Sequence, residues 1–253
     1  MLHPSFLSIP LAHRGFHDVT DGRPENSRAA ISAAIAAGYG IEIDLQLSSD
    51  GQAMVFHDYI LDRLTPESGP VRQRSASDLA AIPLSGGDEG IPTLSEVLAL
   101  VDGQVPLLVE LKDQDGAMGD NLGPLEAAAA AAVTGYEGPV ALMSFNPHSV
   151  ARLKELAPNV PRGLVTDGYL EQNWSLLRSE RRDELREIPD FDRVGACFIS
   201  HGVADLSRPR VAEIKAGGAP VFCWTVKSKQ QEAEARMVAD NITFEGYTAE
   251  IPA

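Results

Sequence analysis

The chain has 253 residues, and its 44% hydrophobic and 23% charged side chains exclude a disordered or collagen-like protein. Lysine and arginine number 21 against 36 aspartate and glutamate residues, which gives a formal net charge of −15. A chain this acidic is repelled by nucleic-acid backbones and anionic membrane surfaces. The basic pair Arg181-Arg182 is followed at once by Asp183 and Glu184, so we expect no nucleic-acid partner.

The cysteine content and the N-terminus indicate a reducing compartment. The two cysteines, Cys197 and Cys223, each lie inside an apolar run, which favours buried free thiols over a disulfide framework. The first residues, MLHPSFLSIPLAHRG, lack the basic start and long apolar stretch of a signal peptide. No apolar stretch reaches the roughly 18 residues of a membrane-spanning helix. We therefore expect a cytoplasmic protein without stable membrane insertion.

Short apolar runs alternate with helical patterns along the chain. Strands are predicted at Ser8–Ala12, Ile41–Leu45, Pro106–Leu111, Pro139–Met143, Arg162–Val165, Gly195–Ile199, Pro220–Thr225 and Asn241–Phe244. Helices are predicted between them, at Ser27–Ala37, Leu94–Val101, Gly123–Val133, Pro147–Leu156, Ser179–Glu187, Pro209–Ala216 and Lys229–Ala239. This order predicts an α/β fold with a parallel sheet, either a closed (β/α)8 barrel or an open doubly wound sheet. The open Rossmann form requires a glycine-rich turn after the first strand, and the sequence has none.

One long gap between strands runs from Leu47 to Pro106. Within it, Ala53–Phe56 is predicted to form a hairpin with the preceding strand across the turn Ser48-Ser49-Asp50-Gly51. In a barrel, such a gap is an elaborated loop on the catalytic face. We therefore expect one domain over residues 1–253, with an active-site insertion at about residues 48–105, between the second and third barrel strands.

The segment Ile41–Leu47 carries two carboxylates at alternate positions. Apolar residues at 41, 43, 45 and 47 alternate with polar ones, so Glu42 and Asp44 share one face of the strand. This pattern also fits an antiparallel strand with one solvated face. In a barrel, however, the second face points inward, where two carboxylates need a cation or a proton. A hard metal ion bound through oxygen atoms meets that need.

A third carboxylate ends the apolar run Leu107–Leu111, where Glu110 is followed two residues later by Lys112. The pair fits an ion pair on the surface. The alternative is that Glu110 joins Glu42 and Asp44 around a metal ion while Lys112 points at a bound anion. Because both acidic segments lie at the carboxyl ends of their strands, where barrel active sites are built, a barrel favours the alternative.

Two histidines follow apolar strands at the same expected edge. His13 comes after the first strand and His57 after the Ala53–Phe56 run. Two histidines can divide acid–base chemistry at neutral pH, one taking a proton and one donating it. Arg14 adds a forked donor suited to phosphate oxygens, and Gly15 allows a close backbone approach. Together with the carboxylates and Lys112, this set suits metal-assisted hydrolysis of a phosphate ester.

These residues stand in short motifs that resemble the glycerophosphodiester phosphodiesterase family of bacterial type. In the order of the family, the first half of the chain carries seven of them: His13-Arg14-Gly15, Pro24-Glu25-Asn26-Ser27, Glu42-Ile43-Asp44-Leu45, Ser49-Asp50-Gly51, His57-Asp58 with Leu61 and Arg63, Ile91-Pro92-Thr93-Leu94 and Glu110-Leu111-Lys112. Later matches are Ser144-Phe145 and Trp224-Thr225-Val226. Lys227 stands where the family usually has asparagine, and Asp240–Glu245 reads DNITFE in place of DGIITD.

The resemblance implies a TIM barrel that cleaves glycerophosphodiesters to sn-glycerol 3-phosphate and an alcohol. It implies Mg²⁺ or Ca²⁺ on Glu42, Asp44 and Glu110, with His13 as general base and His57 as general acid. The nucleophile is either water or the hydroxyl of the substrate's own glycerol. Binding residues that follow from the resemblance are Arg14 and Lys112 for the phosphate and Phe145 and Trp224 for the glycerol. His201 and Glu245 are further candidates for the rim of the site.

Two other functions fit parts of the sequence. A lysophospholipase D or sphingomyelinase D-like phosphodiesterase would act on lipids and should expose an apolar or basic docking surface. A non-catalytic barrel that binds a phosphorylated ligand should have lost a histidine or a carboxylate, and all five are present. A small glycerophosphodiester is therefore the expected substrate, while its alcohol, the choice of cation and the oligomeric state stay open.

Overall fold

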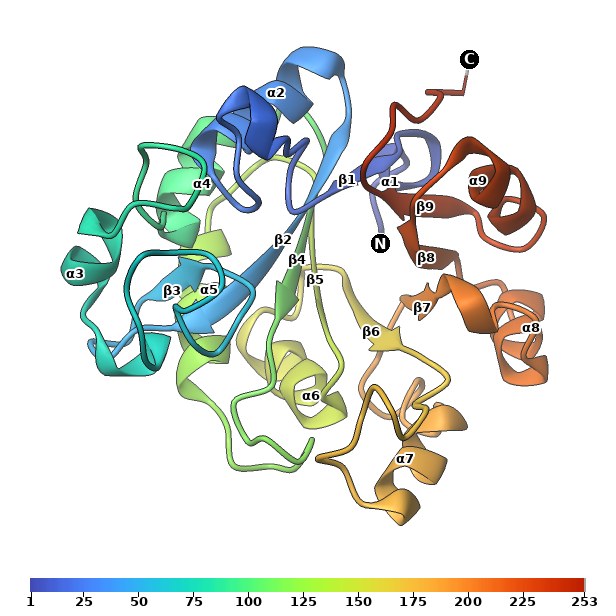
Figure 1. Ribbon diagram of the computed structural model, residues 1–253. Coiled ribbons are helices and arrows are strands. Elements are labelled where there is room, and N and C mark those ends of the chain that lie inside the picture. The colour runs from blue at the N-terminus through green and yellow to red at the C-terminus, as the bar shows by residue number, and fades with distance from the viewer. Residues whose placement is uncertain (253) are drawn as a thin grey trace.

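Within residues 1–252, which the computed structural model describes, eight parallel strands close into a barrel because β1 pairs with both β9 and β2 (Figure 1). The closed barrel confirms the predicted (β/α)8 fold, and each predicted strand has its counterpart. The barrel strands are β1 (Leu11–His13), β2 (Gly40–Leu47), β4 (Leu107–Leu111), β5 (Val140–Ser144), β6 (Arg162–Thr166), β7 (Phe198–Gly202), β8 (Val221–Val226) and β9 (Asn241–Phe244).

Helices surround the barrel on its outer face (Figure 1). The helices of the described chain are α1 (Ser5–Ser8), which lies at the amino end of the barrel, α2 (Arg28–Ala37), α3 (Ala76–Ala81), α4 (Leu94–Val101), α5 (Pro124–Val133), α6 (Pro147–Leu156), α7 (Ser179–Arg186), α8 (Pro209–Ala216) and α9 (Lys229–Ala235). Local chemistry sets several of their starts. The Ser27 hydroxyl caps α2, Thr93 and Glu96 form a capping box on α4, and α6 and α8 begin at proline. α9 ends at Ala235, four residues earlier than predicted.

The predicted hairpin is present in the segment between β2 and β4. Strand β3 (Ala53–Val55) runs antiparallel to β2, with Leu45 opposite Val55, and lies outside the barrel ring. From β3 onward, nine buried side chains of this segment form a separate apolar cluster: Met54, Phe56, Leu61, Leu64, Val71, Leu79, Ile82, Leu84 and Ile91. This cluster gives the segment its own small core, which fixes the loop that carries His57 over the carboxyl end of the barrel.

The amino end of the barrel is closed by the start of the chain, which the sequence pattern did not reveal. The prediction of a strand from Ser8 was wrong, because Ser5–Ser8 forms the turn α1 and β1 begins only at Leu11. The Phe6 side chain is fully buried among Leu11, Phe198 and Phe222 inside the barrel. The Asn241 amide donates hydrogen bonds to the carbonyl oxygens of Phe6 and Ile9, at 2.8 and 2.7 Å.

Two further expectations can be compared with the described residues. Cys197 and Cys223 are both free thiols, as predicted; Cys223 is buried, whereas Cys197 is only partly buried. Among residues 1–252, we find no helix with the length and apolar character needed to span a bilayer.

We expect Phe6→Ala to lower the free energy of unfolding by about 3–5 kcal/mol, because the barrel side chains around Phe6 cannot move in to fill the cavity that its ring leaves. The control is Leu7→Ala, since the neighbouring Leu7 side chain is 45% exposed; its effect should stay within about 0.5 kcal/mol. Urea denaturation followed by circular dichroism measures both. If the two variants lost the same free energy of unfolding, Phe6 would not be the residue that fills the amino end of the barrel.

Candidate active site

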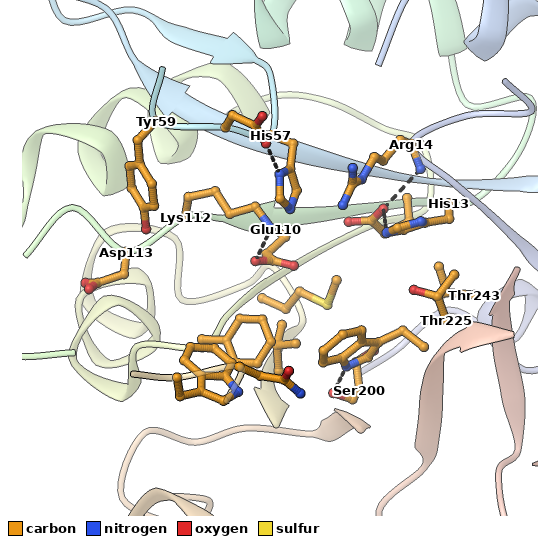
Figure 2. A pocket seen from close by; sticks show the side chains of 18 of the residues that line it. His13, Arg14, His57, Tyr59, Glu110, Lys112, Asp113, Ser200, Thr225 and Thr243 are labelled. Atoms are coloured by element: carbon orange, nitrogen blue, oxygen red, sulfur yellow. Dashed lines mark hydrogen bonds and ion pairs between the residues drawn. The ribbon is translucent and has the colours of Figure 1, made fainter. Parts of the chain in front are cut away.

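A cavity of about 670 Å³ opens at the carboxyl end of the barrel (Figure 2). Its lining contains most of the side chains that the sequence indicated as site residues: His13, Arg14, Glu42, His57, Glu110, Lys112, Phe145 and Trp224. Of the others, Asp44 contacts Arg14 and Lys112 from behind the cavity surface, and His201 and Glu245 are not part of the lining. The fold therefore gathers residues from β1, β2, β4, β5, β8 and the loop after β3 into one site.

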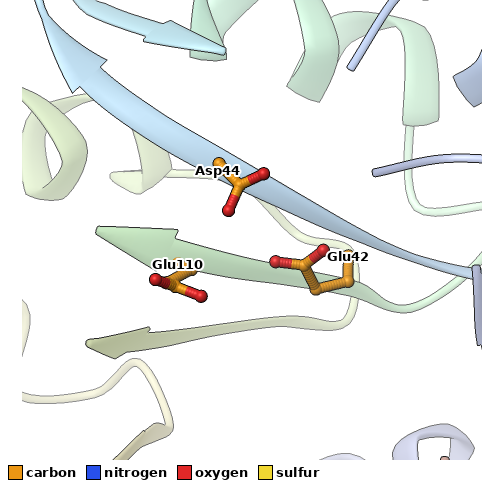
Figure 3. Close-up of side chains that lie close together, drawn as sticks. All are labelled: Glu42, Asp44 and Glu110. Atoms are coloured by element: carbon orange, nitrogen blue, oxygen red, sulfur yellow. The ribbon is translucent and has the colours of Figure 1, made fainter. Parts of the chain in front are cut away.

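Three buried carboxylates, Glu42, Asp44 and Glu110, lie close together on the paired strands β2 and β4, at one side of the cavity (Figure 3). Glu42 and Asp44 project from the same face of β2, and Glu110 lies opposite Asp44 in the pairing of β2 with β4. Oxygen atoms of all three lie within 4.8 Å of one another. Ligands placed about 2.0–2.6 Å from one ion are separated by distances of this size, so the set fits a hard divalent cation.

The three buried carboxylates repel one another and are stabilised by nearby positive charge. Burial, together with the negative charges of Asp44 and Glu110, raises the pKa of Glu42 well above its usual value. Burial would also raise the pKa of Asp44, but Lys112, His57 and Arg14 hold it well below its usual range. The Lys112 ammonium lies 2.7 Å from an oxygen of Asp44 and 2.7 Å from an oxygen of Glu110. The cluster thus holds two cationic groups, Lys112 and Arg14, and retains a carboxylate, Glu42, whose raised pKa shows that its negative charge is not fully compensated.

Each of the two histidines has a carboxylate partner on its Nδ1 atom. His13 Nδ1 lies 2.6 Å from Glu245 Oε2, and His57 Nδ1 lies 2.6 Å from Asp58 Oδ1. A carboxylate on Nδ1 accepts the proton there and leaves Nε2 to exchange a proton with a ligand. Glu245 was a weaker candidate from sequence, and the structure gives it a definite contact.

Arg14 is held in place by a chain of charged side chains. These residues belong to the sequence motifs, but the sequence did not show that they contact one another. Its guanidinium donates to Glu25 Oε1 at 2.6 Å, and Glu25 also accepts from Arg63, which bonds Asp58 in turn. The chain links Arg14 to the Asp58 carboxylate that holds His57. The turn itself is tight: Gly15 has φ +80°, and a Cβ there would approach the Ala30 backbone to 2.9 Å.

Asn26 positions Asp44 from the other side. The Asn26 side chain is fully buried; its Nδ2 donates to Asp44 Oδ2 at 3.0 Å, and its Oδ1 accepts from the Asp44 backbone N–H at 3.3 Å. Asn26 takes a left-handed conformation with φ 60°, which asparagine tolerates better than most residues. The Pro24–Ser27 motif therefore orients a carboxylate in addition to starting α2.

Aromatic rings and two hydroxyl groups form the opposite wall. Phe145 packs edge-on against Trp224 with ring centroids 5.5 Å apart, and Trp174 lies 4.8 Å from Phe145. Trp174 was missed from sequence because it lies in an irregular loop with no periodic pattern. The buried hydroxyls of Ser200 and Thr243 also line the cavity and have no hydrogen-bond partner within residues 1–252.

The placement of His201 on the rim was wrong. Its side chain is fully buried, away from the cavity lining, and bonds to Thr166 Oγ1 at 2.8 Å and to Asp205. The alternation of β7 turns Ser200 into the barrel and His201 outward, toward the surrounding loops.

The sequence model of the glycerophosphoryl diester phosphodiesterase family matches residues 13–242. The chain belongs to this family. It is therefore a phosphoric diester hydrolase, and the resemblance drawn from the short motifs is confirmed. A glycerophosphodiester phosphodiesterase of Caldanaerobacter subterraneus is 30% identical over 233 residues, which cover 88% of this chain and 87% of that protein.

Solved structures of similar fold agree with the barrel. A phosphodiesterase of Oleispira antarctica, solved with its product sn-glycerol 3-phosphate, has a TM-score of 0.76 and 24% identity, over 95% of this phosphodiesterase and 94% of that chain. A glycerophosphodiester phosphodiesterase of Agrobacterium tumefaciens has a TM-score of 0.69 and 24% identity, over 94% and 96% of the two chains.

Proposed function

We propose that this enzyme hydrolyses soluble glycerophosphodiesters to sn-glycerol 3-phosphate and an alcohol. One observation carries the proposal: two carboxylate-paired histidines, an arginine and a lysine line one cavity beside a cluster of three buried carboxylates. Family membership supports the diester chemistry, and the product bound to the Oleispira antarctica phosphodiesterase supports a glycerol phosphate as ligand.

Glu42, Asp44 and Glu110 are the residues that would hold Mg²⁺ or Ca²⁺. A bound divalent cation offsets the negative charge on phosphate oxygens and activates a coordinated hydroxyl. The buried all-oxygen donor set suits either ion, because both prefer carboxylate ligands.

Arg14 and Lys112 would hold the phosphate group. Arg14 is anchored by Glu25 and lies in the cavity lining, so its position is set before substrate binds. Lys112 uses two of its three ammonium hydrogens on Asp44 and Glu110, which leaves one for a phosphate oxygen.

His13 and His57 would move the protons. In this assignment, His13 Nε2 takes the proton of the nucleophile, either water or the glycerol hydroxyl of the substrate. His57 Nε2 gives a proton to the leaving alcohol. Burial lowers the pKa of His13, which favours the neutral imidazole that a base requires.

The glycerol would occupy the side of the cavity formed by Phe145, Trp224, Ser200 and Thr243. A polyol packed against two aromatic rings keeps its carbon atoms in contact with apolar surface, while its hydroxyls need hydrogen-bond partners. The unpartnered hydroxyls of Ser200 and Thr243 can supply them. Thr243 stands in the late motif where the sequence departs from the usual family pattern.

We expect glycerophosphocholine to release sn-glycerol 3-phosphate in the presence of Mg²⁺ or Ca²⁺, and EDTA to abolish that release. Either ion should also raise the melting temperature of EDTA-treated protein, since binding to the folded state stabilises it. Glu110→Gln should remove both effects because one ligand of the cluster is lost. Full activity in EDTA would refute the metal site.

His13→Ala and His57→Ala should each lower kcat by about 10²–10⁴-fold, as expected when an acid or base is removed. The control is His3→Ala, because His3 is exposed and bonds only to the nearby Ser5 among the described residues. Steady-state rates with glycerophosphocholine measure the effect. If either active-site variant kept wild-type kcat, its histidine would have no acid–base role.

Glu245→Gln should lower kcat by about 10- to 100-fold with a smaller change in KM, because a neutral amide no longer stabilises a protonated His13. Glu250→Gln is the matched control, since Glu250 is exposed near the end of the chain. A purely structural role for Glu245 would instead lower the melting temperature and leave kcat of the folded fraction unchanged.

A further inference from the structure

A second chamber of about 630 Å³ adjoins the reaction cavity. The two spaces lie side by side, because six residues line both of them: Tyr59, Ile60, Asp113, Met118, Asn173 and Trp174. The chamber has the size of a small-molecule site, and no proton-transfer or phosphate-binding step proposed above uses it.

Apolar side chains line much of the chamber; Tyr59, Ile60 and Leu176 among them are exposed to solvent, whereas Met118 is buried. They come from the loops after β3, β4 and β6, which supply Tyr59 and Ile60, Met118, and Trp174 and Leu176 respectively. Ile60 is 48% exposed and Leu176 is 90% exposed. Apolar groups held in water beside a reaction cavity are a typical feature of a ligand site, because a bound ligand removes them from water.

Two of these loops are fastened by internal hydrogen bonds. The Asp113 carboxylate accepts from the backbone N–H groups of Gly116 and Met118, at 2.8 and 3.2 Å. Arg181 donates to the Met118 carbonyl at 2.7 Å, and Trp174 Nε1 donates to Asp167 at 2.8 Å. The walls are therefore preformed, so a ligand need not order them first.

The two ends of the combined space differ in chemistry. Figure 2 shows Thr243 at one side of the cavity and Tyr59 and Asp113 at the other, with His57 and Lys112 between them. The side with the unpartnered hydroxyls of Ser200 and Thr243 suits the glycerol. The chamber then faces the other ester group of the phosphate.

The chain order agrees with this orientation. His57, which would protonate the leaving alcohol, is followed after one residue by Tyr59 and Ile60 of the chamber wall. An alcohol protonated by His57 would therefore have the chamber next to it.

We propose, building on the proposed function, that this chamber binds the leaving alcohol and favours glycerophosphodiesters whose alcohol carries an apolar chain of several carbons. The apolar side chains of Ile60 and Leu176 would contact that chain. The enzyme would then discriminate by the alcohol, while the glycerol phosphate half stays the same for every substrate.

The test compares sn-glycero-3-phosphoethanol with sn-glycero-3-phosphohexanol, both as soluble monomers. The two alcohols are equally poor leaving groups, so the ratio of their kcat/KM values reports contacts with the chain alone. Four added methylenes in an apolar site should raise kcat/KM for the hexyl ester by about 10- to 100-fold. Leu176→Ser and Ile60→Ser should each reduce the ratio of hexyl to ethyl ester by about threefold or more.

Met237→Ser is the matched control, because Met237 is 85% exposed but lies outside the chamber lining; it should leave the ratio unchanged. Equal kcat/KM for both esters would overturn the assignment of the chamber. A further comparison sets lysophosphatidylcholine with a hexanoyl chain on its glycerol against glycerophosphocholine, which lacks that chain. The hexanoyl chain should bring no comparable gain in kcat/KM. A higher kcat/KM for the lysophosphatidylcholine would overturn the assignment of the chamber to the alcohol side. If neither ester released sn-glycerol 3-phosphate, the proposed function itself would fail.

Discussion

The mutual repulsion of three buried carboxylates is the constraint around which the site is arranged. Glu42, Asp44 and Glu110 can lie this close only if positive charge is near, and Lys112 supplies part of it. The remaining demand explains why the cluster fits a divalent cation and why Arg14 is drawn to the same edge. In the proposed function, a bound divalent ion together with Arg14 and Lys112 would attract a phosphate group, although the chain as a whole carries a charge of −15.

Much of this constraint was predictable because it is local in sequence. The alternation in Ile41–Leu47 fixes which face Glu42 and Asp44 share, and the strand ends fix which edge they reach. The same reasoning located Glu110, Lys112 and both histidines, and the eight strands predicted the barrel. These predictions succeeded because the periodicity of a strand and the position of its end can be read from a few neighbouring residues.

The rest depends on contacts between distant parts of the chain. His13 and Glu245 are 232 positions apart, and Arg63 reaches Glu25 across 38. No local pattern pairs them, because closure of the barrel alone brings β1 beside β9. Trp174 and Leu176 lie in an irregular loop, where neither a period of two nor one of 3.6 marks which side chain faces a cavity. The burial of Phe6 at the amino end of the barrel was missed for a related reason, since a four-residue helix is too short to show periodicity.

The charged centre of the site and the side chains of the chamber should differ in how readily they can be substituted. Charge balance ties the carboxylates, Lys112 and Arg14 to one another, so a change in any of them leaves an uncompensated buried charge. The chamber side chains Ile60 and Leu176 have no such partners within the described chain and are largely exposed, so exchanging them changes contact with a ligand at little cost in folding. Selection for a new alcohol could therefore act on the loops after β3 and β6 without disturbing the phosphate chemistry. A barrel with a rigid charged centre and independent loops allows substrate preference to change while the reaction stays the same.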